Sequence, residues 1–319
     1  MVAWTAVVPA LIAFAIAAAL GPYMIPYLRK LKMSQTERTY GIEAHLKKTG
    51  TPTMGGVMIL AAFTVTTLLF LPKAPHTGPV LFLTLAFGLI GFVDDYLKVV
   101  KHNPDGLIAW QKLLLEIGVT FLFCLYMVFG TGTSLAIRLP FFNGKMAEIG
   151  ILAYPLLFFA VLGTVNAVNF TDGLDGLASS VTIVVAVFFI IASVKTGAGT
   201  ESAASAVLGA LMGFLVYNAY PAKVFMGDTG SLALGGFVAG MAYMLQIPLF
   251  ILIIGIVYLA EIVSVMIQVT YFKATHGKRV FKMTPIHHHF ELCEWSETRI
   301  VAVFTVVTAL AALIGLLAM

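Results

Sequence analysis

The chain has 319 residues, of which 60% are hydrophobic and only 11% are charged, and its mean hydropathy is +0.98. This composition excludes an ordinary soluble globular protein, because about a quarter of the residues in such proteins are charged. The net charge of +4 and the isoelectric point near 9.0 do not indicate nucleic-acid binding, since the basic residues stand in short loops where they would also attract anionic lipid headgroups.

Long apolar runs without fixed charge predict transmembrane helices. Each run has about 18 to 25 residues, enough for a helix to cross a hydrocarbon core about 30 Å thick. A β-barrel would instead need short strands of alternating hydrophobicity. We therefore predict an all-α membrane protein that forms a single bundle over residues 1–319. About ten transmembrane helices are expected in chain order, at residues 4–27, 53–72, 78–96, 113–131, 149–169, 176–194, 202–219, 229–246, 249–271 and 299–318.

The basic residues predict the orientation of this bundle. Most of the 19 Lys and Arg residues lie in loops that follow odd-numbered spans, whereas the even-numbered loops hold Lys73, Arg138, Lys145 and Lys195. The positive-inside rule puts the odd-numbered loops in the cytoplasm. With an even number of spans, both termini are expected on the extracytoplasmic side.

Aspartates gather where apolar runs end on the predicted cytoplasmic side. They are Asp94, Asp95, Asp105, Asp172, Asp175 and Asp228. Asp94 and Asp95 are adjacent at the end of the third span, and neighbouring carboxylates repel each other unless a cation neutralises them. Lys98, one helical turn further on, can pair with either acid or with a phosphate. A solvated helix end explains this pair equally well when it is taken alone.

The segment Asn166–Gly176 carries a polar side chain at every third position. Asn166, Asn169, Asp172 and Asp175 then lie on roughly one face of a helix or a 3₁₀ turn and present their oxygens to one site. A turn capped by Asx side chains is the structural alternative. That alternative does not explain two asparagines within an apolar span.

Asp228 stands at the start of the eighth span, in the segment Phe225–Ser231. Asp228 or Thr229 can cap that helix, whose free N–H groups can also bind an anion. Only the other acids make Asp228 a candidate metal ligand. Before the second span, Lys48 and Thr53 offer ammonium and hydroxyl donors to phosphate oxygens, although the lysine alone also suits lipid headgroups.

Three further groups are singled out by their spacing. His287, His288 and His289 are consecutive, so they cannot all point one way on a helix, and a zinc site made by this run alone is not expected. Binding of phosphate or proton transfer suits one or two of them. Glu261, Ser264 and Gln268 share one face of the ninth span, and an acid there is expected to face the bundle interior. Lys112 and Glu116 are one turn apart and can pair.

Together these segments resemble the phospho-N-acetylmuramoyl-pentapeptide transferase family, within the polyprenyl-phosphate N-acetylhexosamine-1-phosphate transferase superfamily. The paired acids and the Asn/Asp run are shared across the superfamily, whereas the histidine run is characteristic of the muramoyl branch. The resemblance covers nearly the whole chain in family order, and it rests on Thr51–Gly56, Asp94–Asp95 with Lys98, Asn166–Gly176, Phe225–Ser231 and Pro285–Glu291.

The resemblance implies transfer of phospho-N-acetylmuramoyl-pentapeptide from UDP-N-acetylmuramoyl-pentapeptide to undecaprenyl phosphate. The products would be lipid I and UMP, in the first membrane step of peptidoglycan synthesis, with Mg²⁺ as cofactor. The active site would lie on the cytoplasmic face of the bacterial cytoplasmic membrane, in contact with membrane lipids, and the protein would be a homodimer. No nucleic-acid partner is expected.

The resemblance also implies roles for individual residues. Asp94, Asp95 and Asp228 are expected to be catalytic and to face the metal ion, with Asp228 as the first candidate ligand. We prefer Asp94 as the base, while a covalent phospho-enzyme on Asp228 stays open. The expected substrate-binding residues are Lys48, Thr53, Lys98, Lys112, Asn166, Asn169, Asp172, Asp175, Phe225, Gln268, His287, His288 and His289.

Three other functions remain to be distinguished. A sibling transferase using UDP-N-acetylglucosamine would share the metal site but differ in the histidine loop. A secondary transporter would carry its acids near the bilayer midplane and show internal repeats. A non-catalytic lipid-binding scaffold would explain the basic loops and leave the acids unexplained.

Overall fold

The computed structural model describes all residues except 1, 32–49, 102 and 104. The described chain is mostly helical, as the sequence predicts, and its only sheet is a hairpin of two short strands. The elements are α1 (Val2–Lys30), α3 (Gly56–Phe70), α4 (Gly78–Val99), α5 (Ala109–Leu125), β1 (Ile137–Arg138), β2 (Met146–Ala147), α6 (Ala153–Thr171), α7 (Leu177–Thr196), α8 (Glu201–Asn218), α9 (Gly227–Met244), α10 (Ile251–Ile254), α11 (Ile256–Ala274), α12 (Ile286–Glu291) and α13 (Glu297–Ala318).

Eight of the described helical segments are long and apolar enough to cross a membrane. The chain is therefore a multi-pass membrane protein. The segments expected as spans at 202–219 and 229–246 form α8 and α9, which are not among these eight. The span expected at 249–271 is divided at Gly255, whose backbone leaves the helical conformation between α10 and α11.

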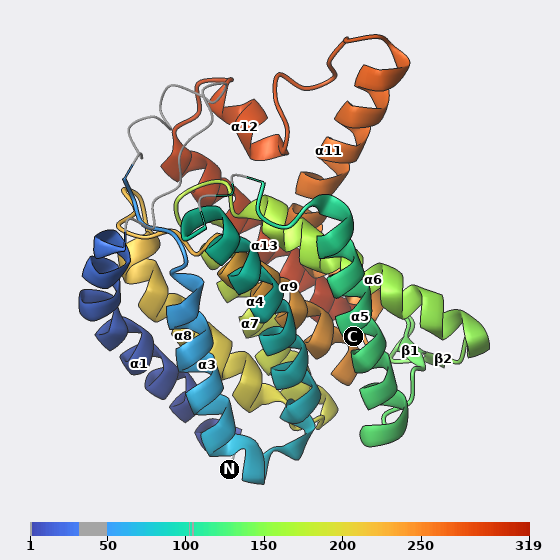
Figure 1. Ribbon diagram of the computed structural model, residues 1–319. Helices are drawn as coiled ribbons and strands as arrows, with labels where there is room; N and C mark the ends of the chain where they lie inside the picture. The colour runs from blue at the N-terminus through green and yellow to red at the C-terminus, as the bar shows by residue number, and fades with distance from the viewer. Residues whose placement is uncertain (1, 32–49, 102, 104) are drawn as a thin grey trace.

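Helix α9 lies at the centre of the bundle. Nearly all of its residues are buried, and it packs against α3, α4, α6 and α7 (Figure 1). The contact with α4 is very close, because a Cβ atom on Gly91 would lie 2.0 Å from the carbonyl oxygen of Asp228. Only glycine permits this approach, which brings the end of α4 against the start of α9.

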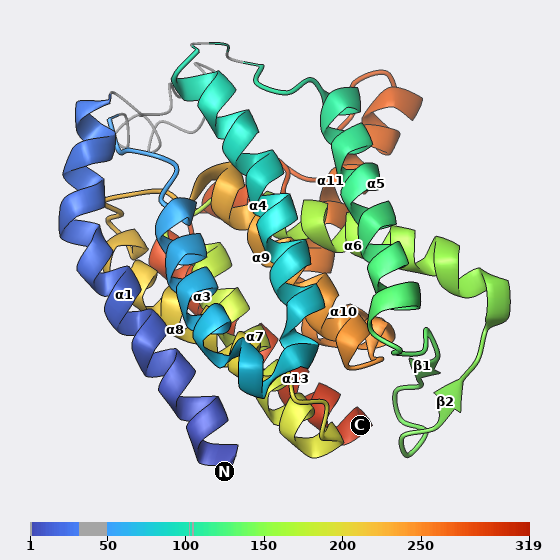
Figure 2. The same ribbon diagram turned by 60° about the horizontal axis from the view of Figure 1, so that its bottom comes forward.

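The helix ends that carry the candidate residues lie at one end of the bundle. They are the C-terminal ends of α4 and α6 and the N-terminal ends of α5, α9 and α13 (Figures 1 and 2). Helix α11 extends beyond its neighbours at this end, and the chain then returns to α12. The β1–β2 hairpin lies towards the other end, where the backbone N–H of Phe141 donates to the carbonyl oxygen of Ala318 at 2.8 Å.

Candidate active site

Asp228 is the side chain on which the candidate site converges. Its Oδ2 atom lies 3.1 Å from the Nζ atom of Lys98 and 3.2 Å from that of Lys112. Its Oδ1 atom accepts a hydrogen bond from the Asn169 amide at 3.0 Å, and the same amide donates to Ser231 at 2.8 Å. Lys98 of α4, Lys112 of α5 and Asn169 of α6 thus meet Asp228 and Ser231 of α9 in a single polar cluster.

The surroundings of Asp228 favour its ionised form. Burial by itself would raise its pKa, but the contact with Asp94, the charges of Lys112 and Lys98 and the amide of Asn169 together hold the pKa of Asp228 well below its usual range. Asp228 is therefore a carboxylate at neutral pH.

Asp94 is buried beside Asp228. Its Oδ2 atom lies 2.6 Å from Lys98 Nζ, and its Oδ1 atom accepts from the backbone N–H of Leu107 at 2.7 Å. The Asp94 and Asp228 carboxyl groups are also within hydrogen-bonding distance of each other. Two such carboxyl groups need a shared proton or a cation between them, and the ammonium group of Lys98 contacts both. The sequence raised this requirement for a different pair, Asp94 and Asp95.

Asp95 has a different environment from its neighbour. Its Oδ1 atom accepts from the backbone N–H of Asp228 at 3.1 Å. Its Oδ2 atom accepts from the backbone N–H and the hydroxyl of Thr229, at 2.9 and 2.6 Å. Asp95 therefore caps the start of α9 from another helix, using the N–H groups that a helix leaves free at its first turn. Neither Asp228 nor Thr229 caps this helix through its own side chain.

The Asn166–Gly176 segment contributes in three different ways. Asn169 joins the cluster at Asp228 directly. Asn166 donates to Glu116 at 2.8 Å, so Glu116 pairs with an amide while Lys112 pairs with Asp228. Asp175 accepts from the backbone N–H of Ala222 at 2.8 Å and holds the loop before α9.

Asp172 ends α6 and lies near the other acids. Burial raises its pKa well above the usual range, and the negative charges of Asp228, Asp95 and Asp175 raise it further. The cluster therefore has an excess of negative charge around Asp172. A cation or a hydrogen-bond donor of a ligand would relieve that excess.

The segment before α3 pairs with the segment before α9. The backbone N–H of Phe225 donates to the carbonyl oxygen of Pro52, and that of Gly55 donates to the carbonyl oxygen of Phe225, both at 2.8 Å. Thr53 is fully buried next to Gly227, and its hydroxyl has no partner among the described residues. Lys48, the other candidate in this segment, lies outside the described residues.

Of the three consecutive histidines, His287 is the one that faces the Asn166–Gly176 segment. His287 is buried, and its Nε2 atom lies where a Cβ atom on Gly173 would stand. Its Nδ1 atom lies 3.0 Å from Glu261 on α11, while Nε2 has no partner among the described residues. Glu261 is the buried acid that the sequence predicted to face the interior.

The other two histidines make contacts with neighbouring parts of the chain. His288 Nδ1 lies 2.6 Å from the carboxylate of Glu291 within α12 itself, whereas His289 Nδ1 accepts from the backbone N–H of Lys282 at 3.1 Å and so connects α12 to the segment before it. Gln268 has a similar role, because its Oε1 atom accepts from the backbone N–H groups of Val280 and Phe281 at 3.0 Å each. These contacts fix the segment that carries His287.

Some members of this polar network were not identified from the sequence. Ser231 shares the Asn169 amide with Asp228, and Glu297 at the start of α13 accepts from the backbone N–H of Asp175. Glu297 carries no sequence signal of this contact. Asp105, which the sequence grouped with the other aspartates, lies outside this network. Its side chain is exposed, and no described side-chain contact joins it to Asp228.

The residues present suit Mg²⁺. Within the part of the chain that the structure describes, no three His, Cys, Asp or Glu side chains form a complete metal cage. Mg²⁺ does not require one, because it commonly binds one or two carboxylates together with substrate phosphates and water. The contact between Asp94 and Asp228 offers two such carboxylates.

Comparison with known proteins gives consistent matches. The model of glycosyl transferase family 4 matches residues 78–246, and the phospho-N-acetylmuramoyl-pentapeptide-transferase signature 1 matches residues 48–60. Proteins named phospho-N-acetylmuramoyl-pentapeptide-transferase are similar over almost their full length. That of Clostridium botulinum is 50% identical over 97% of this chain and 95% of its own. That of Clostridioides difficile is 47% identical over 97% and 96%, and that of Carboxydothermus hydrogenoformans is 48% identical over 99% of each chain.

Proposed function

The chain belongs to the phospho-N-acetylmuramoyl-pentapeptide transferase family, and on this basis we propose the reaction that it catalyses. It transfers phospho-N-acetylmuramoyl-pentapeptide from UDP-N-acetylmuramoyl-pentapeptide to undecaprenyl phosphate, forming lipid I and UMP. The observation that carries this proposal is the polar cluster at Asp228, where two lysines and three acids meet at one end of an apolar bundle.

The reaction depends more on neutralisation of the phosphate charges than on covalent catalysis by the protein. An oxygen of the lipid phosphate attacks the sugar-bearing phosphorus of the donor, and the bond from that phosphorus to the oxygen retained by UMP breaks. A phosphate monoester with a second pKa of about 6 is mostly dianionic at neutral pH, so it is already a nucleophile. Alignment of the two phosphates and neutralisation of their charge account for most of the catalysis.

We assign a separate role in this reaction to each of several described side chains. Lys98 and Lys112 attract phosphate oxygens, and Asp94 takes the remaining proton from an acceptor that arrives protonated. Asp228 contacts Lys98, Lys112 and Asn169 through its two oxygens, and we assign it to the placement of charge rather than to attack on phosphorus. Asp95 positions Asp228 through the backbone of α9.

Mg²⁺ is the proposed cofactor, and Asp228 and Asp94 would hold it. When bound, it supplies neutralisation of the pyrophosphate charge. We assign Asp95 to the support of this site, because its oxygens are used by α9.

The remaining candidates form the rest of the substrate site. Asn169, Asp172 and Asp175 bind the nucleotide end, and Phe225, which is half-buried, stacks on the uracil. His287, whose Nε2 atom has no partner among the described residues, lies at the sugar-phosphate end, and Lys48 and Thr53 contact phosphate. The polyprenyl tail stays in the bilayer, since the chain is a multi-pass membrane protein.

We further propose that the protein acts as a homodimer in the bacterial cytoplasmic membrane, with the Asp228 end of the bundle in the cytoplasm. Light scattering of the detergent-purified protein should give the mass of two chains after subtraction of the detergent. Accessibility of single cysteines to an impermeant thiol reagent in intact cells should leave the Asp228 end unlabelled. A monomer in several detergents, or labelling from outside, would contradict these assignments.

The purified protein should form lipid I when it is given radiolabelled UDP-N-acetylmuramoyl-pentapeptide, undecaprenyl phosphate and Mg²⁺. Removal of divalent cations with EDTA should lower the rate by at least 100-fold, since the charge of the pyrophosphate would no longer be neutralised, and added Mg²⁺ should restore it. A sibling transferase would use UDP-N-acetylglucosamine instead. A transporter or a lipid-binding scaffold would form no lipid product with either donor.

Glu261→Ala should lower turnover about 10-fold to 100-fold, because a buried donor that loses its acceptor costs about 1–3 kcal/mol. The affected donor is the Nδ1–H of His287, which Glu261 orients at 3.0 Å. Initial rates of lipid I formation measure the effect. Ser264→Ala is the matched control, since Ser264 lies on the same helix face and, among the described residues, its hydroxyl bonds to the backbone oxygen of Glu261 alone. Equal rates in the wild type and Glu261→Ala would remove Glu261 from the positioning of His287.

A further inference from the structure

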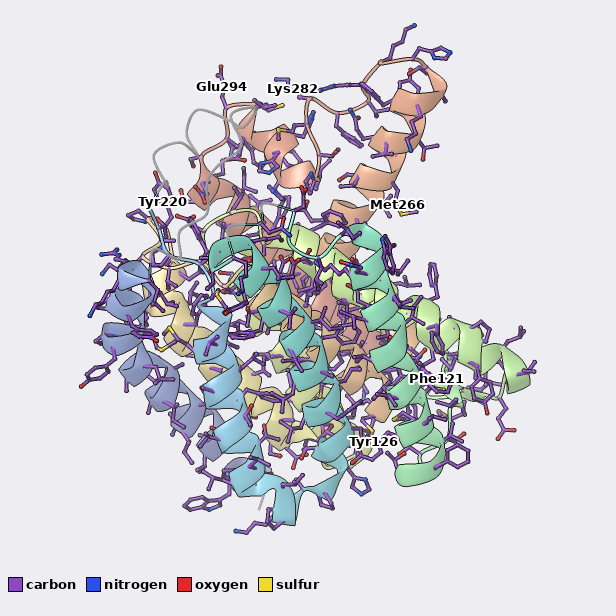
Figure 3. All side chains as sticks on the ribbon, in the orientation of Figure 1. Phe121, Tyr126, Tyr220, Met266, Lys282 and Glu294 are labelled. Atoms are coloured by element: carbon purple, nitrogen blue, oxygen red, sulfur yellow. The ribbon has the colours of Figure 1, made fainter. Side chains whose placement is uncertain are left out.

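A pocket lies beside the candidate active site, where α11 extends beyond its neighbours. It has a volume of about 250 Å³ and is formed by α11 and by the segment that returns to α12. Figure 3 labels a residue on each side of the turn, Met266 on α11 and Lys282 on the returning segment. The lining residues are Gln268, Val269, Phe272, Lys273, Arg279, Met283 and Thr284.

The chemistry of the pocket suits an anion that carries apolar groups. Lys273 and Arg279 are its charged residues, and no acid pairs with either of them within the described chain. Val269, Phe272 and Met283 supply an apolar wall. The guanidinium of Arg279 donates to the backbone carbonyl oxygen of Lys282 at 3.1 Å, which leaves its positive charge without a described acid. Cations of this kind beside apolar side chains bind a carboxylate with aliphatic substituents.

The pocket is fixed to the same elements as His287. Gln268 lines it and accepts from the backbone N–H groups of Val280 and Phe281. Glu261, on the same face of α11, contacts His287. With a rise of 1.5 Å per residue, Gln268 lies about 10 Å and Lys273 about 18 Å along α11 from Glu261.

We propose that this pocket binds the peptide stem of the donor, with Lys273 and Arg279 recognising a peptide carboxylate. This inference rests on the proposed function. It gives a binding site to the peptide stem, the part of the donor that the residues around Asp228 do not contact in the proposed mechanism. A pentapeptide ends in a carboxylate and spans about 17 Å when extended. This reach matches the distance from the His287 region to the cationic pocket.

An anionic lipid headgroup has the same charge as a peptide carboxylate. The reach argument favours the peptide, and so does the connection through Gln268 to the segment that carries His287. The two sources predict different results when the donor or the lipid is varied.

The decisive measurement is donor binding by calorimetry without undecaprenyl phosphate, so that no turnover occurs. The probes are UDP-N-acetylmuramoyl-pentapeptide and the same molecule with its peptide carboxylates converted to amides. The Lys273→Gln/Arg279→Gln double variant should bind the acidic donor about 10-fold more weakly than the wild type does, which equals about 1.4 kcal/mol. The amidated donor should bind both proteins with the same reduced affinity.

Lys278→Gln is the matched control, because Lys278 is an exposed cation of the same segment that does not line the pocket. It should bind both donors as the wild type does. The two single variants should each show part of the loss and melt at the temperature of the wild type.

Three results would overturn the proposal. These are wild-type affinity of the double variant for the acidic donor, equal weakening of both donors, and an effect that appears only in nanodiscs of anionic lipid and not in zwitterionic ones. The last result would assign the pocket to a lipid headgroup. Failure of the proposed function is distinguishable, because the wild type would then form no lipid I, whereas failure of this inference alone leaves wild-type turnover intact.

Discussion

Asp228→Asn should lower the rate of lipid I formation by about 1,000-fold or more while the protein stays folded. The substitution removes the negative charge at which Lys98, Lys112 and Asn169 converge. It also removes the carboxylate that is proposed to hold Mg²⁺. A loss of this size corresponds to about 4 kcal/mol of transition-state stabilisation. Initial rates with radiolabelled donor at saturating substrate measure it.

Asp105→Asn provides the control for this prediction. Asp105 belongs to the same set of loop aspartates in the sequence, but it is exposed and outside the cluster. Its substitution should leave the rate within about twofold of the wild type. Turnover of Asp228→Asn within 10-fold of the wild type, at an unchanged melting temperature, would mean that the reaction does not depend on this carboxylate.

Asp95→Asn should reduce both the stability and the rate. Three donors on α9 share the two oxygens of Asp95, and an asparagine offers one oxygen and turns an NH₂ group towards the others. A buried donor left without an acceptor costs about 1–3 kcal/mol, so we expect about 3 kcal/mol of lost stability. The start of α9 would then shift and move Asp228, which should lower the rate about 100-fold.

Thermal unfolding in detergent, followed by circular dichroism, separates this role from a direct catalytic one. Thr229→Val removes one of the three donors and leaves the backbone N–H groups in place. It should therefore produce a smaller loss of stability in the same direction. An unchanged melting temperature in Asp95→Asn together with a collapse of the rate would instead assign Asp95 to direct contact with the metal ion or the substrates.

The adjacent acids Asp94 and Asp95 show what a local sequence motif can predict and what it cannot. The pair Asp94–Asp95 indicated a site that must neutralise negative charge, because repulsion between neighbouring carboxylates is a property of the sequence itself. The pair did not indicate that the two side chains differ. Asp94 contacts Asp228, whereas Asp95 bonds to the backbone of α9.

The histidine run gives the same lesson. The helical period alone excludes a common direction for three successive side chains. The helical period does not tell which of the three histidines faces the Asn166–Gly176 segment. Contact of His287 with Gly173 and Glu261 decides this, and it depends on how α11 and α12 pack.

The sequence by itself determined the class of the protein, and it proposed most of the side chains that the structure brings together at Asp228. Apolar runs and charged loops act locally, because each helix satisfies its own backbone hydrogen bonds and each loop charge avoids the membrane independently. Only the tertiary structure decided the partner of each polar side chain, including the pairing of Glu116 with Asn166 and the cap that Asp95 provides for α9. Partners such as Asp95 and Asp228 are 133 residues apart. They meet because α4 and α9 pack at a glycine, and such a contact depends on the three-dimensional shapes of two helices rather than on either segment alone.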